Sequence, residues 1–278
     1  MCDHYAERLR RDLLKWLQED SPLGDLSVDA LFDGEKDIIM NIVANDEVYF
    51  VCPKLIEDAL SCFNIEVRVK EEGWREGLLL TLEGDARKLL MLERPLLNFL
   101  IYVLSVSTEV RKVRELLDEN GFDNVRVAVT RKTVPGMRLW AKLFARRAGA
   151  DTHRLSLSDM VMIKDTHAMA YGSLLEAVKK ARERASFAHK IEVEVSSLEE
   201  ALEVLPYVDV IMLDNVGPKE AKEYACEIKR KRNDVVVEVS GGIKRENVLE
   251  YLNECIDVVS MGYLTMFPPR VDLSARVE

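Results

Sequence analysis

Short runs of β-branched and aliphatic residues recur through the second half of the chain, and each run predicts a strand. The runs are VRVAVT, MVMIKD, KIEVEV, DVIMLDN, DVVVEVS and DVVSMG, and most of the segments between them have helical character. This alternation predicts a parallel sheet with right-handed crossovers, covered on both faces. A full barrel of about eight strands needs two more. The pattern therefore predicts either an incomplete barrel or a barrel with two poorly marked strands.

The first part of the chain, up to about residue 83, has a mixed pattern. MCDHYAERLRRDLLKWLQED predicts an amphipathic helix, and KLIEDALSCF predicts a second one. Four segments between and after them are typical of strands: DIIMNIVA, EVYFVCP, EVRVKEE and LLLTLEG. This part of the chain is therefore expected to form a small α+β lobe.

A long helical segment follows the lobe and is expected to bridge two domains. It begins after Asp85, a plausible N-cap, is interrupted at Pro95 and ends at Gly121. The expected domains are an N-terminal lobe over residues 1–106, joined by the C-terminal tail 268–278, and a barrel over residues 107–267.

The composition is that of a soluble globular protein. The 278 residues are 48% hydrophobic and 32% charged, and no run of about eighteen apolar residues predicts a membrane span. The N-terminal helix lacks the features of a signal peptide, so we expect a cytoplasmic protein. A net charge of -10 argues against binding of nucleic acid, because that function needs a broad basic face.

The cysteines show no metal-binding or disulfide pattern. They are scattered, odd in number and without CxxC spacing, at Cys2, Cys52, Cys62, Cys226 and Cys255. We therefore expect buried free thiols.

Polar or glycine residues follow each of the six predicted strands in the second half. In a barrel the C-terminal strand ends converge on one face, so these residues are expected around one cavity. Any single charged residue after a strand is more often part of a solvated loop, but six in succession weaken that reading. The residues at or near these ends are Thr130, Arg131, Lys132, Lys164, Asp165, Glu194, Asp214, Asn215, Ser240, Gly241, Gly242 and Gly262.

Two kinds of chemistry are expected at these ends. Ser240-Gly241-Gly242 and Gly262 follow the last two strands, where barrels commonly bind phosphate through backbone N–H groups. Glu194 and Asp214 are expected to bind Mg²⁺ together with substrate oxygens. The alternative for Glu194 is an alternating strand residue that pairs with a nearby lysine.

Cations concentrate between residues 130 and 167, which hold eight Lys or Arg against three Asp. Arg131, Lys132, Arg154 and Lys164 are placed to point into a site, and guanidinium groups suit carboxylates and phosphates. His153 alone is more often a structural hydrogen-bonding residue than a catalyst. The expected ligand is a metal-bound polyanion with phosphate at one end. Three of the four remaining cations, Arg138, Lys142 and Arg146, fall at helical spacing and predict a solvated helix face.

The motifs around these residues resemble those of a known enzyme family. TRKTVPGMRLWAKLFARRAGADTHRLSLSDMVMIKDTH, followed by IEVEVSSLEEALE, VIMLDN, VEVSGGI and VVSMGYLT, resembles quinolinate phosphoribosyltransferase. EDSPLGDLSVDAL and LERPLLNFL extend the resemblance to nearly the whole chain. It implies an α/β fold with an N-terminal α/β sandwich lobe and an incomplete, six-stranded α/β barrel. It also implies a homodimer, or a higher oligomer, with shared active sites.

The implied reaction is transfer of phosphoribose from phosphoribosyl pyrophosphate to quinolinate with decarboxylation, a step of NAD synthesis. Position by position, the resemblance assigns quinolinate binding to Arg131, His153, Arg154 and the partner subunit's Arg94. Lys132 and Lys164 match lysines between the two substrates, and Glu194 and Asp214 match the acidic pair near the ribose and Mg²⁺. Ser240, Gly241 and Gly262 match the phosphate-binding residues.

Two departures from the family pattern keep alternatives open. Met266-Phe267-Pro268-Pro269 stands where the family usually has His-Ser, and Val51-Cys52 stands where a small Ala-Gly pair is common. The chain therefore also resembles ModD-like proteins, which share the fold and are expected to use another acceptor. A non-catalytic anion-binding protein on the same scaffold is the third reading. Retention of Glu194, Asp214, Lys132 and Lys164 disfavours that third reading.

Overall fold

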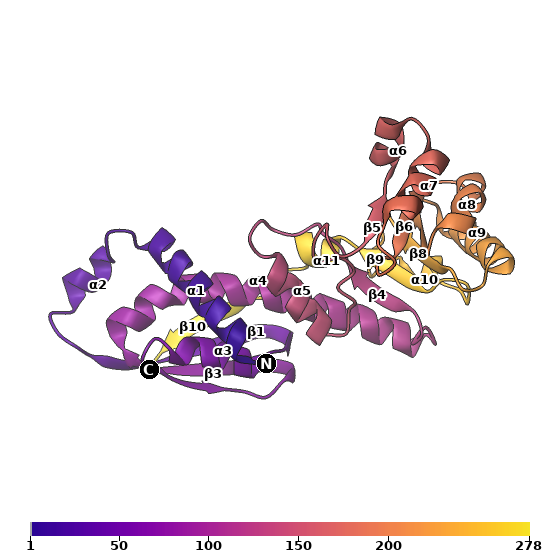
Figure 1. Cartoon of the computed structure of the whole chain (residues 1–278). Helices are drawn as coiled ribbons and strands as arrows, with labels where there is room; N and C mark the ends of the chain where they lie inside the picture. The colour runs from indigo at the N-terminus through magenta and orange to yellow at the C-terminus, as the bar shows by residue number, and fades with distance from the viewer. Residues whose placement is uncertain (1) are drawn as a thin grey trace. The chain divides into compact units, whose positions relative to one another are not determined.

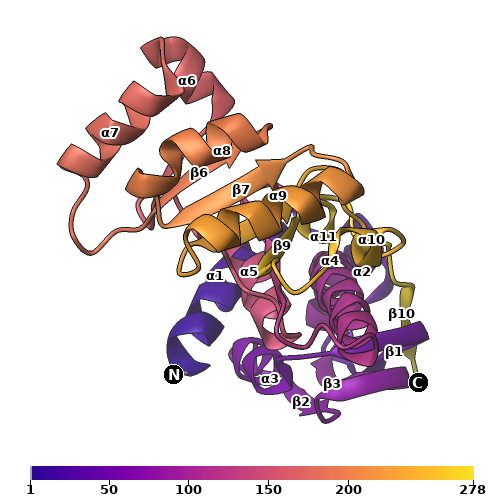
Figure 2. The same cartoon turned by 90° about the vertical axis from the view of Figure 1, so that its right-hand side faces the viewer.

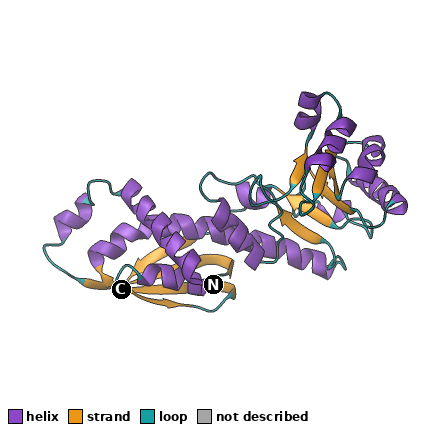
Figure 3. Cartoon of the chain, in the orientation of Figure 1, coloured by secondary structure: helices purple, strands orange, loops and turns teal. Residues whose placement is uncertain are grey.

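The structure, a computed structural model, describes residues 2–278. Met1, expected to begin the first helix, lies outside the described residues, as does the side chain of Cys2. The chain divides into two compact units, Met1–Glu109 with Pro268–Glu278, and Val110–Phe267. Figures 1 and 3 show that each unit has its own sheet.

The first unit contains an antiparallel sheet of strand order β10-β1-β3-β2. The C-terminal tail belongs to it, because Val277 in β10 pairs with Met40 in β1. Its core includes Met40, Ile42 and Phe50. The elements are α1 (Cys2–Asp20), α2 (Leu26–Leu31), β1 (Asp37–Phe50), α3 (Pro53–Ser61), β2 (Glu66–Val69), β3 (Gly73–Asp85) and β10 (Leu273–Val277), together with the start of α4 (Ala86–Glu119).

Strand β1 replaces two predicted strands. DIIMNIVA and EVYFVCP were expected to be separate, but they form one strand with a register shift between Ala44 and Val48. A bulge lets a strand continue through extra residues that do not fit the regular pairing. The polar Asn45 at this bulge donates its N–H to the Asp272 carbonyl at 2.9 Å. The polar interruption therefore marks a bulge and not a turn.

Helix α4 starts at the predicted cap, since the N–H of Lys88 donates to Oδ1 of Asp85 at 3.2 Å. The predicted interruption at Pro95 is wrong, because the helix runs through that residue. Leu96, Leu97 and neighbouring apolar residues are buried, and this packing holds the helix together despite the missing proline N–H. By length and composition α4 is long and apolar enough to cross a membrane, but 61% of its most apolar window is buried inside the protein. An apolar helix that is mostly buried is typical of the core of a folded protein.

The second unit confirms the six predicted strands. They form an all-parallel sheet of order β4-β9-β8-β7-β6-β5. Helices α7, α8 and α9 pack against it, and Figure 2 shows α8 and α9 along one face. The elements are β4 (Arg126–Val129), α5 (Arg138–Arg147), β5 (Val161–Ile163), α6 (Asp165–Tyr171), α7 (Leu174–Arg184), β6 (Ile191–Val195), α8 (Leu198–Val204), the short 3-10 helix η1 (Leu205–Tyr207), β7 (Val210–Asp214), α9 (Pro218–Lys231), β8 (Val236–Ser240), α10 (Val248–Tyr251), β9 (Val258–Met261) and α11 (Tyr263–Met266).

The barrel is incomplete, because β4 and β5 are the two edges of the sheet and do not pair with each other. Part of this gap is filled at Asp151, whose N–H donates to the Val127 carbonyl at 2.7 Å. The N–H of Val129 in turn donates to the Asp151 carbonyl at 3.0 Å. Asp151 thus forms one β-bridge with the β4 edge of the sheet, to Ala128. The residues after Asp151 enter the open side of the barrel.

The cysteines differ from the prediction. Cys226 on α9 and Cys255 before β9 form a disulfide across a sequence separation of 29 residues. The fold brings these two segments together, and nothing in their sequence spacing signals it. Cys52 is buried and outside any disulfide, as expected, whereas Cys62 is likewise outside any disulfide but exposed.

Candidate functional site

A cavity of about 420 Å³ opens at the C-terminal strand ends of the barrel. Convergence of parallel strands brings most of the predicted site residues into its wall. Their roles in binding and catalysis stay predictions. The lining residues are Thr130, Arg131, Lys132, His153, Arg154, Met162, Lys164, Asp165, Glu194, Met212, Asp214, Ser240 and Ser260.

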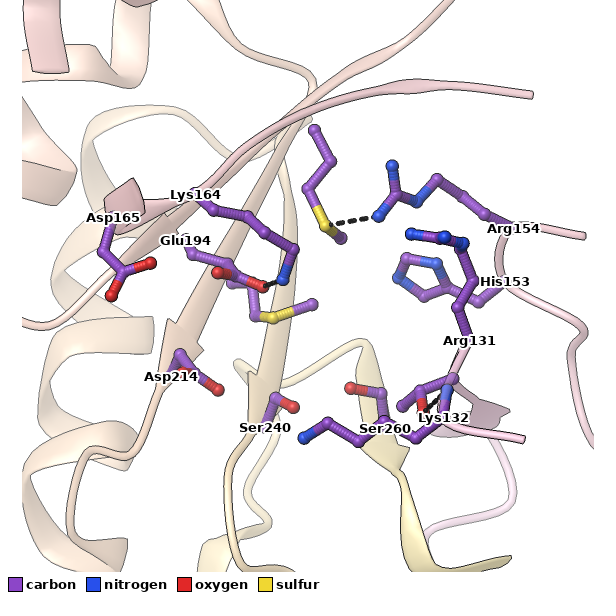
Figure 4. A pocket seen from close by; sticks show the side chains of 13 residues that line it. Arg131, Lys132, His153, Arg154, Lys164, Asp165, Glu194, Asp214, Ser240 and Ser260 are labelled. Carbon is purple, nitrogen blue, oxygen red and sulfur yellow. Dashed lines mark hydrogen bonds and ion pairs between the residues drawn. The ribbon is translucent and has the colours of Figure 1, made fainter. Parts of the chain in front are cut away.

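The cavity has a cationic and an acidic side. Figure 4 shows Arg131, His153 and Arg154 along one side, and Asp165, Glu194 and Asp214 along the opposite side. The cations follow β4 or lie in the segment that enters the gap of the barrel, whereas the carboxylates lie at or just after the C-terminal ends of β5, β6 and β7. A ligand that spans this cavity therefore meets positive charge at one end and carboxylates at the other.

On the acidic side, Nζ of Lys164 donates to Oε1 of Glu194 (Figure 4). The lysine pairing considered as the alternative for Glu194 is therefore present, and both partners still line the cavity. The carboxylate of Asp214 is oriented by its neighbour, because Nδ2 of Asn215 donates to Oδ2 of Asp214 at 2.7 Å. His167 does not line the cavity; its Nδ1 accepts the main-chain N–H of Lys164 at 3.0 Å.

The predicted phosphate-binding glycines lie next to the cavity and do not line it. Gly241 has φ of +96°, and a Cβ there would lie 2.5 Å from the main-chain nitrogen of Asn215. A Cβ on Gly262 would lie 2.8 Å from Cδ of Lys132. Gly241 therefore needs glycine, because main-chain atoms lie in the way, whereas a Cβ at Gly262 would require the Lys132 side chain to shift, and Gly242 has open space around it. Ser240 lines the cavity itself.

On the cationic side, His153 turns toward two carboxylates inside the barrel. Its Nε2 lies 3.2 Å from Oε2 of Glu238 and 3.4 Å from Oε1 of Glu192, and both glutamates are buried. Burial lowers the pKa of the His153 imidazole, but hydrogen bonds and charges from Glu192 and Glu238 outweigh burial and raise the pKa to about 10. Burial also raises the pKa of Glu192. The two glutamates thus favour an imidazolium at His153.

The guanidinium groups beside His153 have unused donors. Arg154 is only 6% exposed, and its Nη2 lies 2.9 Å from Sδ of Met162. Within the described residues, the buried Nε atoms of Arg131 and Arg154 have no hydrogen-bond partner. Burial lowers the pKa of Arg154. A buried donor without an acceptor is unfavourable, so an anion on this side of the cavity would relieve that cost.

Lys142 corrects the prediction of a solvated helix face. Its side chain on α5 is fully buried, and Nζ donates to the carbonyl oxygens of Thr152 and Arg154. Burial, followed by the charges of Arg138, Arg131 and Arg154, lowers the pKa of Lys142 to about 8. Of the other cations on α5, Arg146 and Arg147 are exposed and Arg138 is half-buried.

Comparison with known proteins agrees with this architecture. Residues 106–276 match the family model of the quinolinate phosphoribosyl transferase C-terminal domain. Over all of this chain and 99% of the relative, a probable nicotinate-nucleotide pyrophosphorylase [carboxylating] of Methanocaldococcus jannaschii is 40% identical. The chain belongs to the quinolinate phosphoribosyltransferase family.

Two further similarities support membership of this family. A probable nicotinate-nucleotide pyrophosphorylase [carboxylating] of Methanothermobacter thermautotrophicus is 34% identical over all of this chain and 99% of the relative. The crystal structure of NadC from Streptococcus pyogenes has a TM-score of 0.87 at 30% identity, and the match covers 98% of this chain and 96% of that one. The quinolinate phosphoribosyltransferase fold therefore extends through both units.

Arg94, the remaining residue assigned through the family resemblance, lies on α4 in the N-terminal unit. Its side chain is 57% exposed, and Nη2 lies 3.9 Å from Oε1 of Glu93. Arg94 is not among the residues that line the barrel cavity.

Sequence reasoning missed the layer of side chains just below the predicted site residues. Glu192 and Glu238 precede Glu194 and Ser240 by two positions, and residues two apart on a strand face the same side. The same offset relates Met162, Met212 and Ser260 to later site positions. This periodicity was the signal that would have found them.

Proposed function

We propose that this protein transfers phosphoribose from phosphoribosyl pyrophosphate to quinolinate, with release of pyrophosphate and carbon dioxide to give nicotinate mononucleotide in NAD synthesis. The observation that carries the proposal is the division of the cavity into a cationic and an acidic side. Quinolinate has two neighbouring carboxylates, and the other substrate carries phosphates that bind a metal ion. Membership of the family and the names of its relatives support this choice of substrates.

The three cations on one side orient the acceptor. Arg131 and Arg154 offer unpaired N–H groups, and His153 adds a third positive charge to a site for two carboxylates. Holding the carboxylates aims the ring nitrogen of quinolinate at the ribose carbon that it attacks. These residues therefore act as orienting groups and not as acids or bases.

The transfer step forms a bond between the ring nitrogen and the ribose carbon, and it breaks the bond from that carbon to pyrophosphate. Negative charge grows on the leaving oxygen, where Lys132 and Lys164 are available in the cavity wall. Positive charge grows on the ribose carbon, which the carboxylates of Glu194 and Asp214 stabilise. The bond between the ring carbon and one carboxylate then breaks, and carbon dioxide leaves. The electron pair of that bond stays on the ring carbon next to the alkylated nitrogen, and a proton takes the place of carbon dioxide.

Glu194 and Asp214 also fit an Mg²⁺ site. Both are carboxylates in the cavity wall, and Mg²⁺ in such sites takes one or two carboxylates together with substrate phosphates. The ion supplies charge neutralisation for the diphosphate of the donor. Asn215 orients the Asp214 carboxylate, and Lys164 orients that of Glu194.

We further propose a homodimer in the cytoplasm, in which Arg94 of the partner subunit completes the acceptor site. The family resemblance supports this assembly, and the exposed side chain of Arg94 is available for such a contact.

A direct assay tests the function. Purified protein is mixed with quinolinate, phosphoribosyl pyrophosphate and Mg²⁺, and nicotinate mononucleotide is measured by chromatography, with EDTA abolishing its formation. Glu194→Gln should lower kcat at least about a hundredfold, whereas Glu183→Gln on the surface of α7, 66% exposed, should leave it unchanged.

A wild-type protein that forms no nicotinate mononucleotide would overturn the proposal. If it still bound phosphoribosyl pyrophosphate in calorimetry, the ModD-like alternative with another acceptor would be favoured. The altered sequence Met266-Phe267-Pro268-Pro269 is the observation that keeps that alternative in view.

A further inference from the structure

Residues 152–154 carry two of the cavity cations but belong to no helix or strand. His153 has φ of 51°, a left-handed conformation that is unfavourable for a residue with a side chain. Its N–H donates to Oδ1 of Asp151 at 2.7 Å. A segment of this kind keeps one conformation only when its surroundings determine it.

Lys142 holds the main chain of this segment. Its Nζ donates to the carbonyl oxygens on both sides of His153, those of Thr152 and of Arg154, the latter at 2.6 Å. The ammonium group is fully buried, and the charges of Arg138, Arg131 and Arg154 oppose it. Its donors satisfy two carbonyl oxygens that an apolar side chain would leave without these partners, so the lysine fixes the conformation of the segment.

Glu238 holds the side chain of His153. Its Oε2 lies 3.2 Å from Nε2 of His153, and the carboxylate comes from β8 inside the barrel. Because Nε2 faces Glu238 and Glu192, Nδ1 is the ring nitrogen that remains for a ligand in the cavity. Neither Lys142 nor Glu238 lines that cavity.

We propose that Lys142 and Glu238 are positioning residues for the acceptor. Lys142 fixes the backbone around His153, and Glu238 fixes its imidazole, so that His153 and Arg154 direct their N–H groups toward the carboxylates of quinolinate. This inference rests on the proposed function. The donor side, with Lys132, Glu194 and Asp214, makes no hydrogen bond to Lys142 or Glu238 within the described residues, so the effect is confined to the acceptor.

The test uses Lys142→Met, which removes the ammonium group and keeps most of the side-chain length, and Glu238→Gln, which removes the charge at the same length. Each should raise the KM for quinolinate about tenfold or more, with the KM for phosphoribosyl pyrophosphate within about twofold of the wild type. The matched controls are Arg146→Met, an exposed cation on the same helix, and Glu203→Gln, an exposed carboxylate on α8. Both controls should leave the two KM values unchanged.

A double-mutant cycle separates positioning from general structural support. In a His153→Ala background, Lys142→Met should raise the KM for quinolinate by a smaller factor than in the wild type, because the part of its effect that acts through the imidazole is already lost. Full additivity would overturn the proposal, and so would equal increases in both KM values together with a lower Tm. Stoichiometric zinc in the wild type that is lost in Glu238→Gln would also overturn it and assign His153, Glu192 and Glu238 to a metal site.

Quinolinate binding is measured by calorimetry in addition to turnover. The two measurements distinguish failure of the proposed function from failure of the proposed positioning role. A wild type that binds quinolinate without turnover would overturn the proposed function while the variants still test the positioning. Unchanged quinolinate affinity in both variants would overturn the positioning alone. A wild type that does not bind quinolinate would overturn both.

Discussion

His153 and Glu238 form a buried charge pair, with Nε2 of His153 lying 3.2 Å from Oε2 of Glu238. The histidine side chain is 11% exposed and the carboxylate 3% exposed, so water screens this interaction weakly. Glu192 adds a second carboxylate at 3.4 Å from the same nitrogen. The imidazole is therefore held in its protonated form at a pH where histidine is ordinarily neutral.

The first prediction is that His153 links stability to pH. Its pKa is about 10 in the folded protein against 6.5 ordinarily, so its stabilising contribution is complete below pH 6.5 and is lost as pH rises through about 10. The slope is at most about 1.4 kcal/mol per pH unit. Lys142, with its pKa lowered to about 8, has the opposite effect above that pH. Between pH 6.5 and 8 the pH dependence of the free energy of unfolding therefore reports His153 with little effect from Lys142.

Two measurements check this prediction. Urea unfolding gives the free energy of unfolding at each pH, and ¹⁵N-histidine NMR reports the protonation of the ring directly. The resonance that disappears in His153→Asn should still be that of an imidazolium at pH 8. A neutral ring at pH 7.5 would contradict the prediction.

The second prediction concerns Gly241→Ala. A methyl group there would meet the main chain of Asn215 at 2.5 Å, and φ is +96°. We expect a loss of about 2–4 kcal/mol in the free energy of unfolding. Activity should fall as well, because Asn215 orients the Asp214 carboxylate.

Gly242→Ala is the matched control for Gly241→Ala. Gly242 also has positive φ, of +65°, but nothing lies near the position of its Cβ. Its loss should be limited to the backbone cost of about 1–2 kcal/mol. Equal losses in urea unfolding of the two variants would show that the contact with Asn215 does not matter.

Much of the fold was predictable because the six parallel strands are apolar and β-branched, and turn or helix signals separate them. The failures have tertiary causes. Helix α4 passes Pro95 because its apolar residues pack in a core, and β1 continues across Ala44 to Val48 through a bulge. The pairing of Cys226 with Cys255 depends on the neighbouring positions of two segments in the folded chain.

The cavity residues were predictable where they follow strands, since parallel strands end on one face. Glu192 and Glu238 were missed because they lie one layer deeper, inside runs that look like ordinary core strands. Lys142 was missed for a different reason. Trp140, Phe144 and other residues around α5 are buried, so helical spacing did not show which cation faced solvent.

The third prediction is that the Cys226–Cys255 disulfide stabilises the barrel unit. Closing a loop of this separation, 29 residues, is worth about 3–4 kcal/mol in the chain-entropy estimate. The variant Cys226→Ser/Cys255→Ser should lose about 2–4 kcal/mol in urea unfolding. Cys62→Ser, at an exposed free thiol, is the control and should lose almost nothing. Peptide mapping without reductant should recover the Cys226 and Cys255 peptides linked, and separate peptides would contradict the prediction.

The fourth prediction tests the shared site of the proposed dimer. Arg94→Ala and Lys132→Ala should each lose activity, the first through weaker quinolinate binding. If each barrel uses Arg94 of the partner subunit, a mixed dimer of the two variants contains one intact site. Random reassociation should then restore about a quarter of the wild-type sites. The control replaces Lys132→Ala with the double variant Arg94→Ala/Lys132→Ala, which leaves no intact site in any dimer. Activity of the first mixture no higher than that of this control would show that each subunit uses its own Arg94 or none.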